Sequence, residues 1–268
     1  MSTLRFSQRL LGRPPPPRRR EFHTVNYAWE RLTSTVHRCR LPFLDVTVGL
    51  VWGGDGVLVI DTGTTLAEAA AVDADAQLLT GRRVTHVVLT HKHFDHVLGS
   101  SAFSGAVIYS APEVADYLCA GVDELRADAL RHGAAADEID RAIAALRPPD
   151  QRVYDAVIDL GGRGVSVSHP GRGHTSADLI VSVPGVDGAA EHAVVFCGDL
   201  VEESADPAID ADSDVGAWPD TLDNVLRIGG PDARYVPGHG AVVDARFIEN
   251  QRSWLLGYRH GDGRVERV

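Results

Sequence analysis

Four side chains of the kinds that bind metal ions stand within six consecutive positions, at His91, His93, Asp95 and His96. Neutral imidazole and carboxylate groups together form the ligand set of zinc and other borderline divalent ions. A single histidine among apolar residues is more often a packing residue than a ligand. A solvated loop, however, has no need for four such side chains in so short a run, so the segment is predicted to bind metal.

The short segment of residues 84–89, just before this cluster, reads as an apolar β-strand. Open α/β sheets place their sites at the carboxyl ends of strands, so the loop that follows is a suitable place for ligands. On an extended or turning loop, His91 and His93 project to one side. Asp95 and His96 can face a second position close by, so the four side chains need not share one ion.

Three further ligand-type residues, His174, Asp199 and His239, each follow a glycine just after an apolar segment. A glycine in a tight turn lets the backbone come close to its neighbours. Each of these patterns is common by itself, but here all three accompany the histidine cluster. His169 is an alternative to His174, although the Gly-His-Thr context favours His174. The histidines outside these motifs, His132 among them, are expected to have no ligand role.

Alternating strand and helix patterns supply the elements that must position these residues. Residues 46–52 and 57–60 are apolar and flank a Gly-Gly-Asp-Gly turn, which predicts a β-hairpin. Residues 111–147 are rich in Ala, Asp, Glu, Leu and Arg and predict two or three helices. Mixed strands and helices of this kind indicate sheets covered by helices. The other expected elements are strands at 107–109, 165–167, 179–183, 193–197 and 235–236 and helices at 66–79, 219–228 and 245–258.

Five motifs carry the candidate ligands and an upstream aspartate: Ile60-Asp61-Thr62-Gly63, His91-x-His93-x-Asp95-His96, Gly173-His174-Thr175, Gly198-Asp199 and Pro237-Gly238-His239-Gly240. Over about residues 45–243 they resemble the metallo-β-lactamase-fold superfamily. The resemblance implies an α/β fold of four layers, an αββα sandwich. Two mixed β-sheets would face each other, helices would cover the outer faces, and the metals would lie at one edge.

The resemblance also implies how the ligands divide between two divalent ions, zinc in the first place, with iron or manganese as alternatives. Asp61 would orient ligands from behind. Lactamases that use a cysteine ligand lack an aspartate at the bridging position, so Cys197 is expected to be a buried apolar residue. One ion would be bound by His91, His93 and His174, the other by Asp95, His96 and His239, with Asp199 bridging them.

Two such ions, about 3.5–4 Å apart, hold a hydroxide between them and stabilise charge on the attacking and leaving atoms. Asp95 is the candidate catalytic residue, because its free carboxylate oxygen can orient this hydroxide or take up its proton. The predicted function is a binuclear zinc-dependent hydrolase that cleaves an ester, lactone, amide or related bond of a small molecule. The helical segment 111–147 is either a lid over the substrate or a packing element, and Trp218 is a candidate lining residue.

Two other activities of the same superfamily are alternatives. A sulfur dioxygenase keeps these motifs but binds one iron and oxidises persulfides. A glyoxalase II-type thioesterase carries a sizeable helical domain after the last histidine, whereas 29 residues follow His239 here. A non-catalytic binding protein would be expected to lack ligands, but none of the seven positions is missing.

Composition limits the remaining choices. The net charge of −11 argues against a nucleic-acid substrate, since proteins that bind nucleic acids gather positive charge. Three widely spaced cysteines form no disulfide framework, so a cytoplasmic location is expected. No apolar stretch is long enough for a membrane span. Residues 1–24 are expected to be a flexible Pro/Arg-rich segment and residues 25–268 a single domain with a helical insert at about 111–147; a homodimer is compatible with the sequence.

Overall fold

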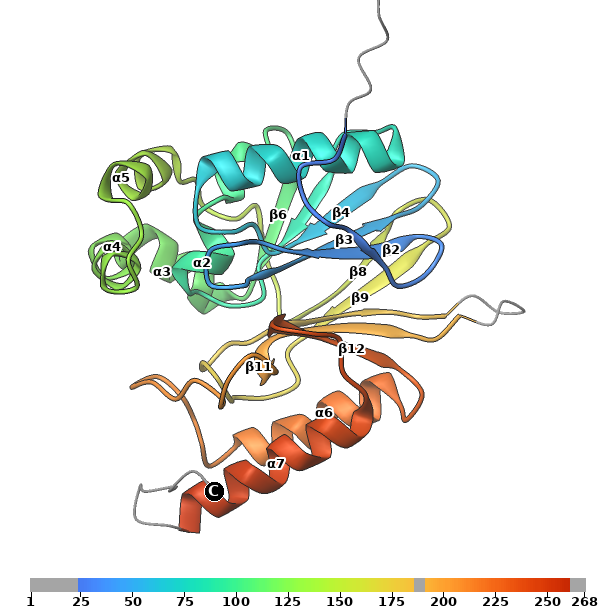
Figure 1. The fold of residues 1–268 in the computed structure, drawn as a ribbon, viewed down its shortest axis with the longest axis vertical. Helices are drawn as coiled ribbons and strands as arrows, with labels where there is room; N and C mark the ends of the chain where they lie inside the picture. Colours follow the sequence, from blue (N-terminus) through green and yellow to red (C-terminus); the bar gives the residue numbers. More distant parts are fainter. Residues whose placement is uncertain (1–23, 186–190, 261–268) are drawn as a thin grey trace, which may run out of the picture.

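The computed structural model describes residues 24–185 and 191–260, and its chain forms two β-sheets with helices on their outer faces (Figure 1). Almost all of the predicted Pro/Arg-rich segment 1–24 therefore lies outside the described residues, and the division into tail and single domain stays a prediction. No helix of the described chain is long and apolar enough to cross a membrane.

The first sheet has seven strands in sequence order, from β1 to β7. Its first four strands pair antiparallel, whereas β4, β5, β6 and β7 pair parallel. The predicted hairpin is β3 with β4, and its register pairs Trp52 with Val57 next to the turn. The strands are β1 (Glu30–Arg31), β2 (Val36–Arg40), β3 (Thr47–Trp52), β4 (Val57–Ile60), β5 (His86–Val88), β6 (Val107–Ser110) and β7 (Gln151–Arg152).

The second sheet has five strands in the order β12-β11-β10-β9-β8. It is mixed as well, because β11 and β12 pair parallel and the other neighbours pair antiparallel. Two mixed sheets with outer helices confirm the predicted αββα fold. The strands are β8 (Asp155–Asp159), β9 (Gly164–Ser168), β10 (Ile180–Val183), β11 (Val194–Glu202) and β12 (Arg234–His239).

Helices form the two outer layers and one end of the molecule. Figure 1 shows α1 (Leu66–Thr80) over the first sheet and α6 (Trp218–Gly229) and α7 (Ala245–His260) over the second. Helix α1 begins with a capping box, in which Thr65 Oγ1 accepts from the backbone N–H of Glu68 at 3.1 Å and the Glu68 carboxylate accepts from the N–H of Thr65. The short helix α2 (Phe94–Val97) follows the histidine cluster.

The segment 111–147 is helical, as predicted, and contains three helices, α3 (Pro112–Ala120), α4 (Val122–Arg131) and α5 (Ala136–Ala145). They lie together at one end of the sandwich, beside α2 (Figure 1). Their buried residues include Leu125 and Ile139, which belong to the core cluster formed between the sheets. The insert is therefore packed onto the domain.

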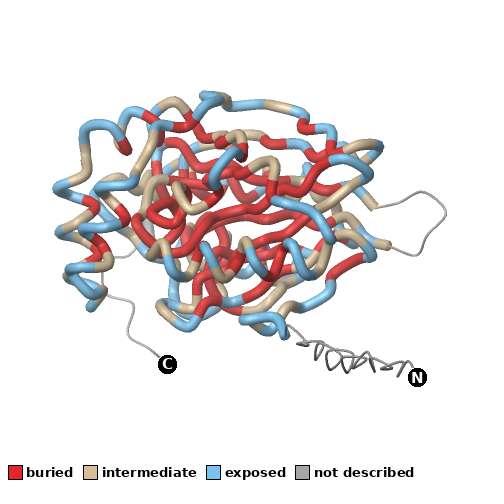
Figure 2. The backbone as a smooth tube through the Cα atoms, turned by 90° about the horizontal axis from the view of Figure 1, so that it is seen from above, coloured by how far each residue is buried: buried red, intermediate tan, exposed pale blue. Residues whose placement is uncertain are grey.

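Buried positions run through the middle of the molecule and exposed positions cover its periphery (Figure 2). One core cluster joins the facing sides of the two sheets, with Val59 of β4 and Val181 of β10 among its members. A second cluster lies between the second sheet and the helices α6 and α7 and includes Trp218. These two cores hold the strand ends that carry the candidate ligands.

Two expected boundaries are wrong. Strand β11 does not end at Cys197 but continues to Glu202 across register shifts around Gly198, whose φ is +52°. Strand β12 likewise continues through His239, which lies inside the strand end and not after it. β-Bulges of this kind redirect the side chains that follow, which here include Asp199.

Candidate metal centre

The seven candidate ligands meet at one edge of the sandwich, where β5, β11 and β12 end. His91 and His93 lie on the loop after β5, and Asp95 and His96 follow in α2. The parallel pair of β11 and β12 brings Asp199 close to His239, in register through Gly198 and Pro237. The structure thus brings together all seven residues that the sequence singled out.

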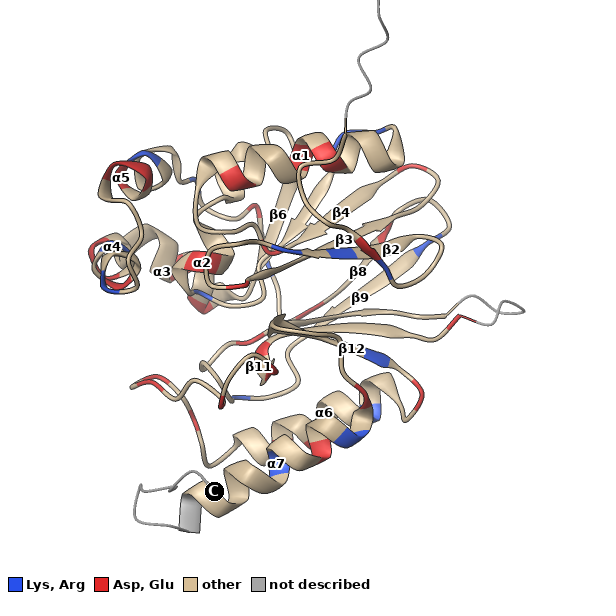
Figure 3. Ribbon diagram, viewed as in Figure 1, with Lys and Arg blue, Asp and Glu red and all other residues tan. Residues whose placement is uncertain are grey.

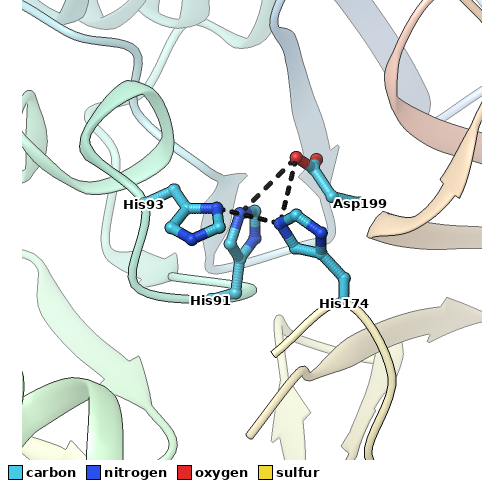
Figure 4. A group of neighbouring side chains, drawn as sticks. All are labelled: His91, His93, His174 and Asp199. Carbon is cyan, nitrogen blue, oxygen red and sulfur yellow. Dashed lines mark hydrogen bonds and ion pairs between the residues drawn. The ribbon is translucent and has the colours of Figure 1, made fainter. Parts of the chain in front are cut away.

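Three histidines and one aspartate form the first donor group (Figure 4). His174 Nε2 lies 2.8 Å from His93 Nδ1. Asp199 Oδ2 lies 3.5 Å from that same His174 nitrogen and 3.6 Å from His91 Nε2. The imidazole rings of His91 and His93 stand nearly perpendicular, at 86°, so their nitrogens converge on one point from different directions.

The second donor group consists of Asp95, His96 and His239. His239 Nε2 lies 3.4 Å from Asp95 Oδ2 and 3.4 Å from His96 Nε2. Asp199 reaches this group too, with Oδ2 3.3 Å from His239 Nε2 and Oδ1 3.2 Å from His96 Nε2. One carboxylate is therefore in contact with both groups.

These separations fit metal coordination. Ligand atoms at the zinc–nitrogen distance of ~2.0–2.1 Å around a tetrahedral ion lie roughly 3.3 Å from one another. The observed separations of 2.8 to 3.6 Å scatter around that value. His91 Nε2 and Asp199 Oδ1 are buried atoms with no hydrogen-bond partner, which is costly unless another group satisfies them. The donor sets fit metal ions.

Asp61 supports the histidine cluster through hydrogen bonds, as expected. Its carboxylate accepts hydrogen bonds from the backbone N–H and the hydroxyl of Thr90, both at 2.8 Å, and its Oδ2 lies 2.9 Å from His96 Nδ1. These contacts orient His96 so that Nε2 faces the second donor group. Asp61 has φ of +58°, a left-handed conformation that L-residues other than Asn and Asp seldom adopt.

Backbone carbonyl groups orient two more ligands. His239 Nδ1 lies 2.8 Å from the carbonyl oxygen of Leu44, and His174 Nδ1 lies 3.2 Å from that of Ala208. Each contact leaves Nε2 free to face the site. Leu44 has φ of +57°, so the turn that presents its carbonyl is strained.

Burial and charge divide the histidines into two kinds. Burial lowers the pKa of His91 well below its usual range and lowers that of His174. Burial acts in the same direction on His239, but Asp199 outweighs it and raises the pKa of His239 to about 10. Asp199 and Asp95 likewise raise the pKa of His96 well above its usual value, against burial. The two aspartates therefore favour the protonated forms of His96 and His239, whereas burial favours the neutral forms of His91 and His174.

Metal binding at pH 7 is expected to release protons from the pair of His96 and His239, because their neighbouring aspartates favour the protonated forms and a ligand nitrogen must be deprotonated. His91 and His174 are expected to contribute least, because burial lowers their pKa. The apparent affinity should therefore rise with pH across the neutral range and fall in acid. Zinc titrations by calorimetry, in two buffers of different ionisation enthalpy, measure the proton number directly; a value of zero would contradict the assignment.

The backbone of Gly238 lies directly against the carboxylate of Asp199. A Cβ at this position would lie 1.8 Å from Asp199 Oδ1, so Gly238→Ala must displace the carboxylate that the two donor groups share. We expect zinc affinity to fall about 10–100-fold, the usual effect of disturbing a ligand's support. Competition with a chromophoric chelator measures this loss. Gly257→Ala is the control, since no atom lies within 4 Å of its Cβ, and it should leave affinity unchanged.

Cys197 belongs to no donor group among the described residues. It is fully buried in the second core cluster, where burial raises the pKa of its thiol. Trp218 was expected to line the pocket, and this is wrong. Its ring is buried in the same cluster, 5.9 Å from that of His174 between centroids, and its indole N–H donates to the carbonyl of Leu200.

A cavity of about 330 Å³ opens over the donor groups. Sequence reasoning missed several residues that line it, among them Glu202, Asp128 and His132. Glu202 lies within ligand distance of Asp199 and His239 because β11 continues past its expected end. Asp128 and His132 come from the helical insert, so α4 forms one wall of the cavity. No residue pattern in the sequence predicts that α4 packs beside the donor groups.

Comparisons with known proteins identify the family of the chain. A family model described as the metallo-beta-lactamase superfamily matches residues 41–239. The metallo-β-lactamase type 2 of Bacteroides fragilis is 32% identical over 117 residues, 42% of this chain and 44% of that protein. Its counterpart from Bacillus cereus is 26% identical over 171 residues, 62% of this chain and 56% of that protein. The chain thus spans about half the length of these curated relatives.

Solved structures share the fold. A metallo-β-lactamase from Pseudomonas aeruginosa, in a mono-zinc form, superposes with a TM-score of 0.66 at 18% identity over 86% of this chain and 95% of that one. A metallo-β-lactamase from Pontibacter korlensis gives a TM-score of 0.64 at 21% identity, over 86% of this chain and 99% of that one. With the family model matching most of its length, the chain belongs to the metallo-β-lactamase superfamily.

Proposed function

We propose that the protein is a metal-dependent hydrolase whose two donor groups bind two divalent ions, zinc in the first place. The observation that carries this proposal is the position of the Asp199 carboxylate. Its Oδ2 lies within 3.6 Å of three histidine Nε2 atoms, and its Oδ1 lies 3.2 Å from a fourth. One ion would be held by His91, His93 and His174 and the other by Asp95, His96 and His239, with Asp199 shared.

Two bound divalent ions would supply Lewis acidity and a water of lowered pKa at neutral pH. The protein's residues hold, orient and move protons around them. Asp95 Oδ2 faces His96 and His239, at 3.6 and 3.4 Å. Its other oxygen is left to accept the proton of the attacking water, which makes Asp95 the proposed catalytic residue.

The cavity of about 330 Å³ is large enough for a small molecule. We propose an ester, lactone, amide or related bond as the one cleaved. The curated relatives are metallo-β-lactamases by name, so cyclic amides belong among the substrates to test. The comparisons favour neither the sulfur dioxygenase nor the thioesterase alternative. A homodimer and a cytoplasmic location stay predictions from the sequence.

Metal content and a substrate panel test the proposal together. We expect two zinc ions per chain and hydrolysis of at least one member of a panel of lactone, ester, thioester, β-lactam and phosphodiester substrates. One iron per chain, with oxygen consumption on glutathione persulfide, would replace hydrolysis by persulfide oxidation. Exclusive turnover of thioesters would support the thioesterase alternative.

A further inference from the structure

The outer wall of the cavity is acidic. The loop 203–217, between β11 and α6, has five acidic residues and no Lys or Arg, and Figure 3 shows this run of acidic positions. Asp206 and Asp210 of this loop line the cavity together with the candidate ligands. No Lys or Arg is found among the described residues that line it.

Three of the five loop acids already have partners. Asp212 pairs with Lys92 at 2.9 Å, and that ammonium also lies 4.5 Å above the ring of Tyr117 in α3. Asp214 lies 3.5 Å from Arg172. Glu203 accepts a hydrogen bond from the backbone N–H of Ala241 at 2.6 Å.

The remaining two, Asp206 and Asp210, have no ion-pair partner within the described part of the chain. They are also the two that face the cavity. An exposed carboxylate keeps its charge in water, but its field still acts on a charged group brought within a few ångströms.

The loop that carries these carboxylates is tied to the donor groups by two hydrogen-bond contacts. The carbonyl of Ala208 lies 3.2 Å from His174 Nδ1, and Ser213 Oγ donates to the carbonyl of His174 at 2.8 Å. Asp206 and Asp210 each stand two residues from Ala208, which keeps their Cα atoms within roughly 7 Å of it. Both residues therefore line the same cavity as the donor groups, within the reach of a small molecule bound there.

The opposite wall does not offset this charge. Asp128 of α4 pairs with Arg131 at 2.6 Å and lies 3.3 Å from His132 Nδ1, so its own charge is compensated. Arg131 is not one of the lining residues. A substrate that extends from the donor groups toward the loop thus meets two carboxylates without an ion-pair partner and no lysine or arginine of the described cavity lining.

We infer that this cavity selects substrates with a cationic substituent a few ångströms from the scissile bond and disfavours those with a carboxylate there. The inference rests on the proposed function, because it concerns the substrate of the same site. The scissile group would lie over the donor groups, and an ammonium or guanidinium group would lie against Asp206 and Asp210. Exposed ion pairs of this kind change binding about twofold to fivefold each, so a total preference of roughly tenfold is expected.

Three phenyl esters of equal chain length test the charge preference. One ends in trimethylammonium, one in the neutral tert-butyl isostere and one in carboxylate. With zinc-loaded protein we expect kcat/KM to fall in that order, with a difference of roughly tenfold between the first two, carried by KM. The double variant Asp206→Asn with Asp210→Asn should make the first two esters equal, and 0.5 M salt should shrink the difference because it shortens the screening length to a few ångströms.

Binding of the three free acids, measured by calorimetry, separates this inference from the proposed function. If no ester is hydrolysed but the trimethylammonium acid still binds most tightly, in a manner that depends on Asp206 and Asp210, the charge preference holds and ester cleavage is wrong. Asp232→Asn, an exposed carboxylate before β12, is the matched control and should change nothing. Equal binding of all three acids, tighter binding of the dicarboxylate, or a preference that survives the double variant would overturn the inference.

Discussion

Replacement of Asp199 by asparagine is expected to lower turnover by more than ~100-fold, beyond the usual effect of losing a residue that only supports a ligand. The carboxylate of Asp199 is in contact with both donor groups. An amide of the same shape cannot supply the negative charge that two cations share. The loss should therefore appear in kcat, and metal analysis should find fewer than two ions per chain.

Two further variants, one expected to lose less activity and one expected to lose none, check the role assigned to Asp199. Asp61→Asn keeps all seven candidate ligand side chains and disturbs the hydrogen bonds that Asp61 makes to His96 and Thr90, so a loss of about 10–100-fold is expected. Asp232→Asn should have no effect. Circular dichroism and thermal melting would establish that each variant is folded. Full activity and two bound ions in Asp199→Asn would contradict the assignment of the shared carboxylate.

Loading the metal-free protein with zinc is expected to raise its stability by several kcal/mol. Buried imidazoles and carboxylates converge here, with His91 and His96 fully buried. A ligand that binds only the folded state stabilises it by ~4 kcal/mol at a free concentration about a thousand times Kd. For a protein of this size that corresponds to roughly 8–16 °C in Tm.

Differential scanning calorimetry with and without zinc measures this shift. Magnesium at the same concentration is the control, because it prefers oxygen ligands and keeps its water. Asp199→Asn should show a smaller zinc shift than the parent protein. An equal Tm with zinc and with chelator would show that the donor groups do not bind zinc in the folded protein.

The candidate ligands could be singled out from the sequence because their chemistry is local. His91 to His96 form one motif, and His174, Asp199 and His239 each stand beside a glycine near a strand end. The sheet positions followed from apolar runs such as β4 and β10. Strands β1 and β2 were not predicted, since the Val-His-Arg-Cys-Arg sequence of β2 lacks an apolar period.

The supports of the ligands were less accessible from sequence. The carbonyls of Leu44 and Ala208, which orient His239 and His174, are backbone groups and have no residue signature. Glu202 lies at the site because β11 continues past a bulge at Gly198. The docking of α4 over the cavity depends on tertiary packing between segments distant in sequence. Only Asp61, part of a recognisable motif, was predicted among the supporting groups.

Lys92 is the single lysine of the chain; apart from histidines, its other basic residues are arginines. It stands between two candidate ligands, paired with Asp212 and lying over Tyr117. Amine-directed reagents used for biotinylation, fluorescent labelling or attachment to a resin will therefore find their only side-chain target inside the metal-binding loop. Labels and supports for this protein are better attached through the exposed Cys119, on α3.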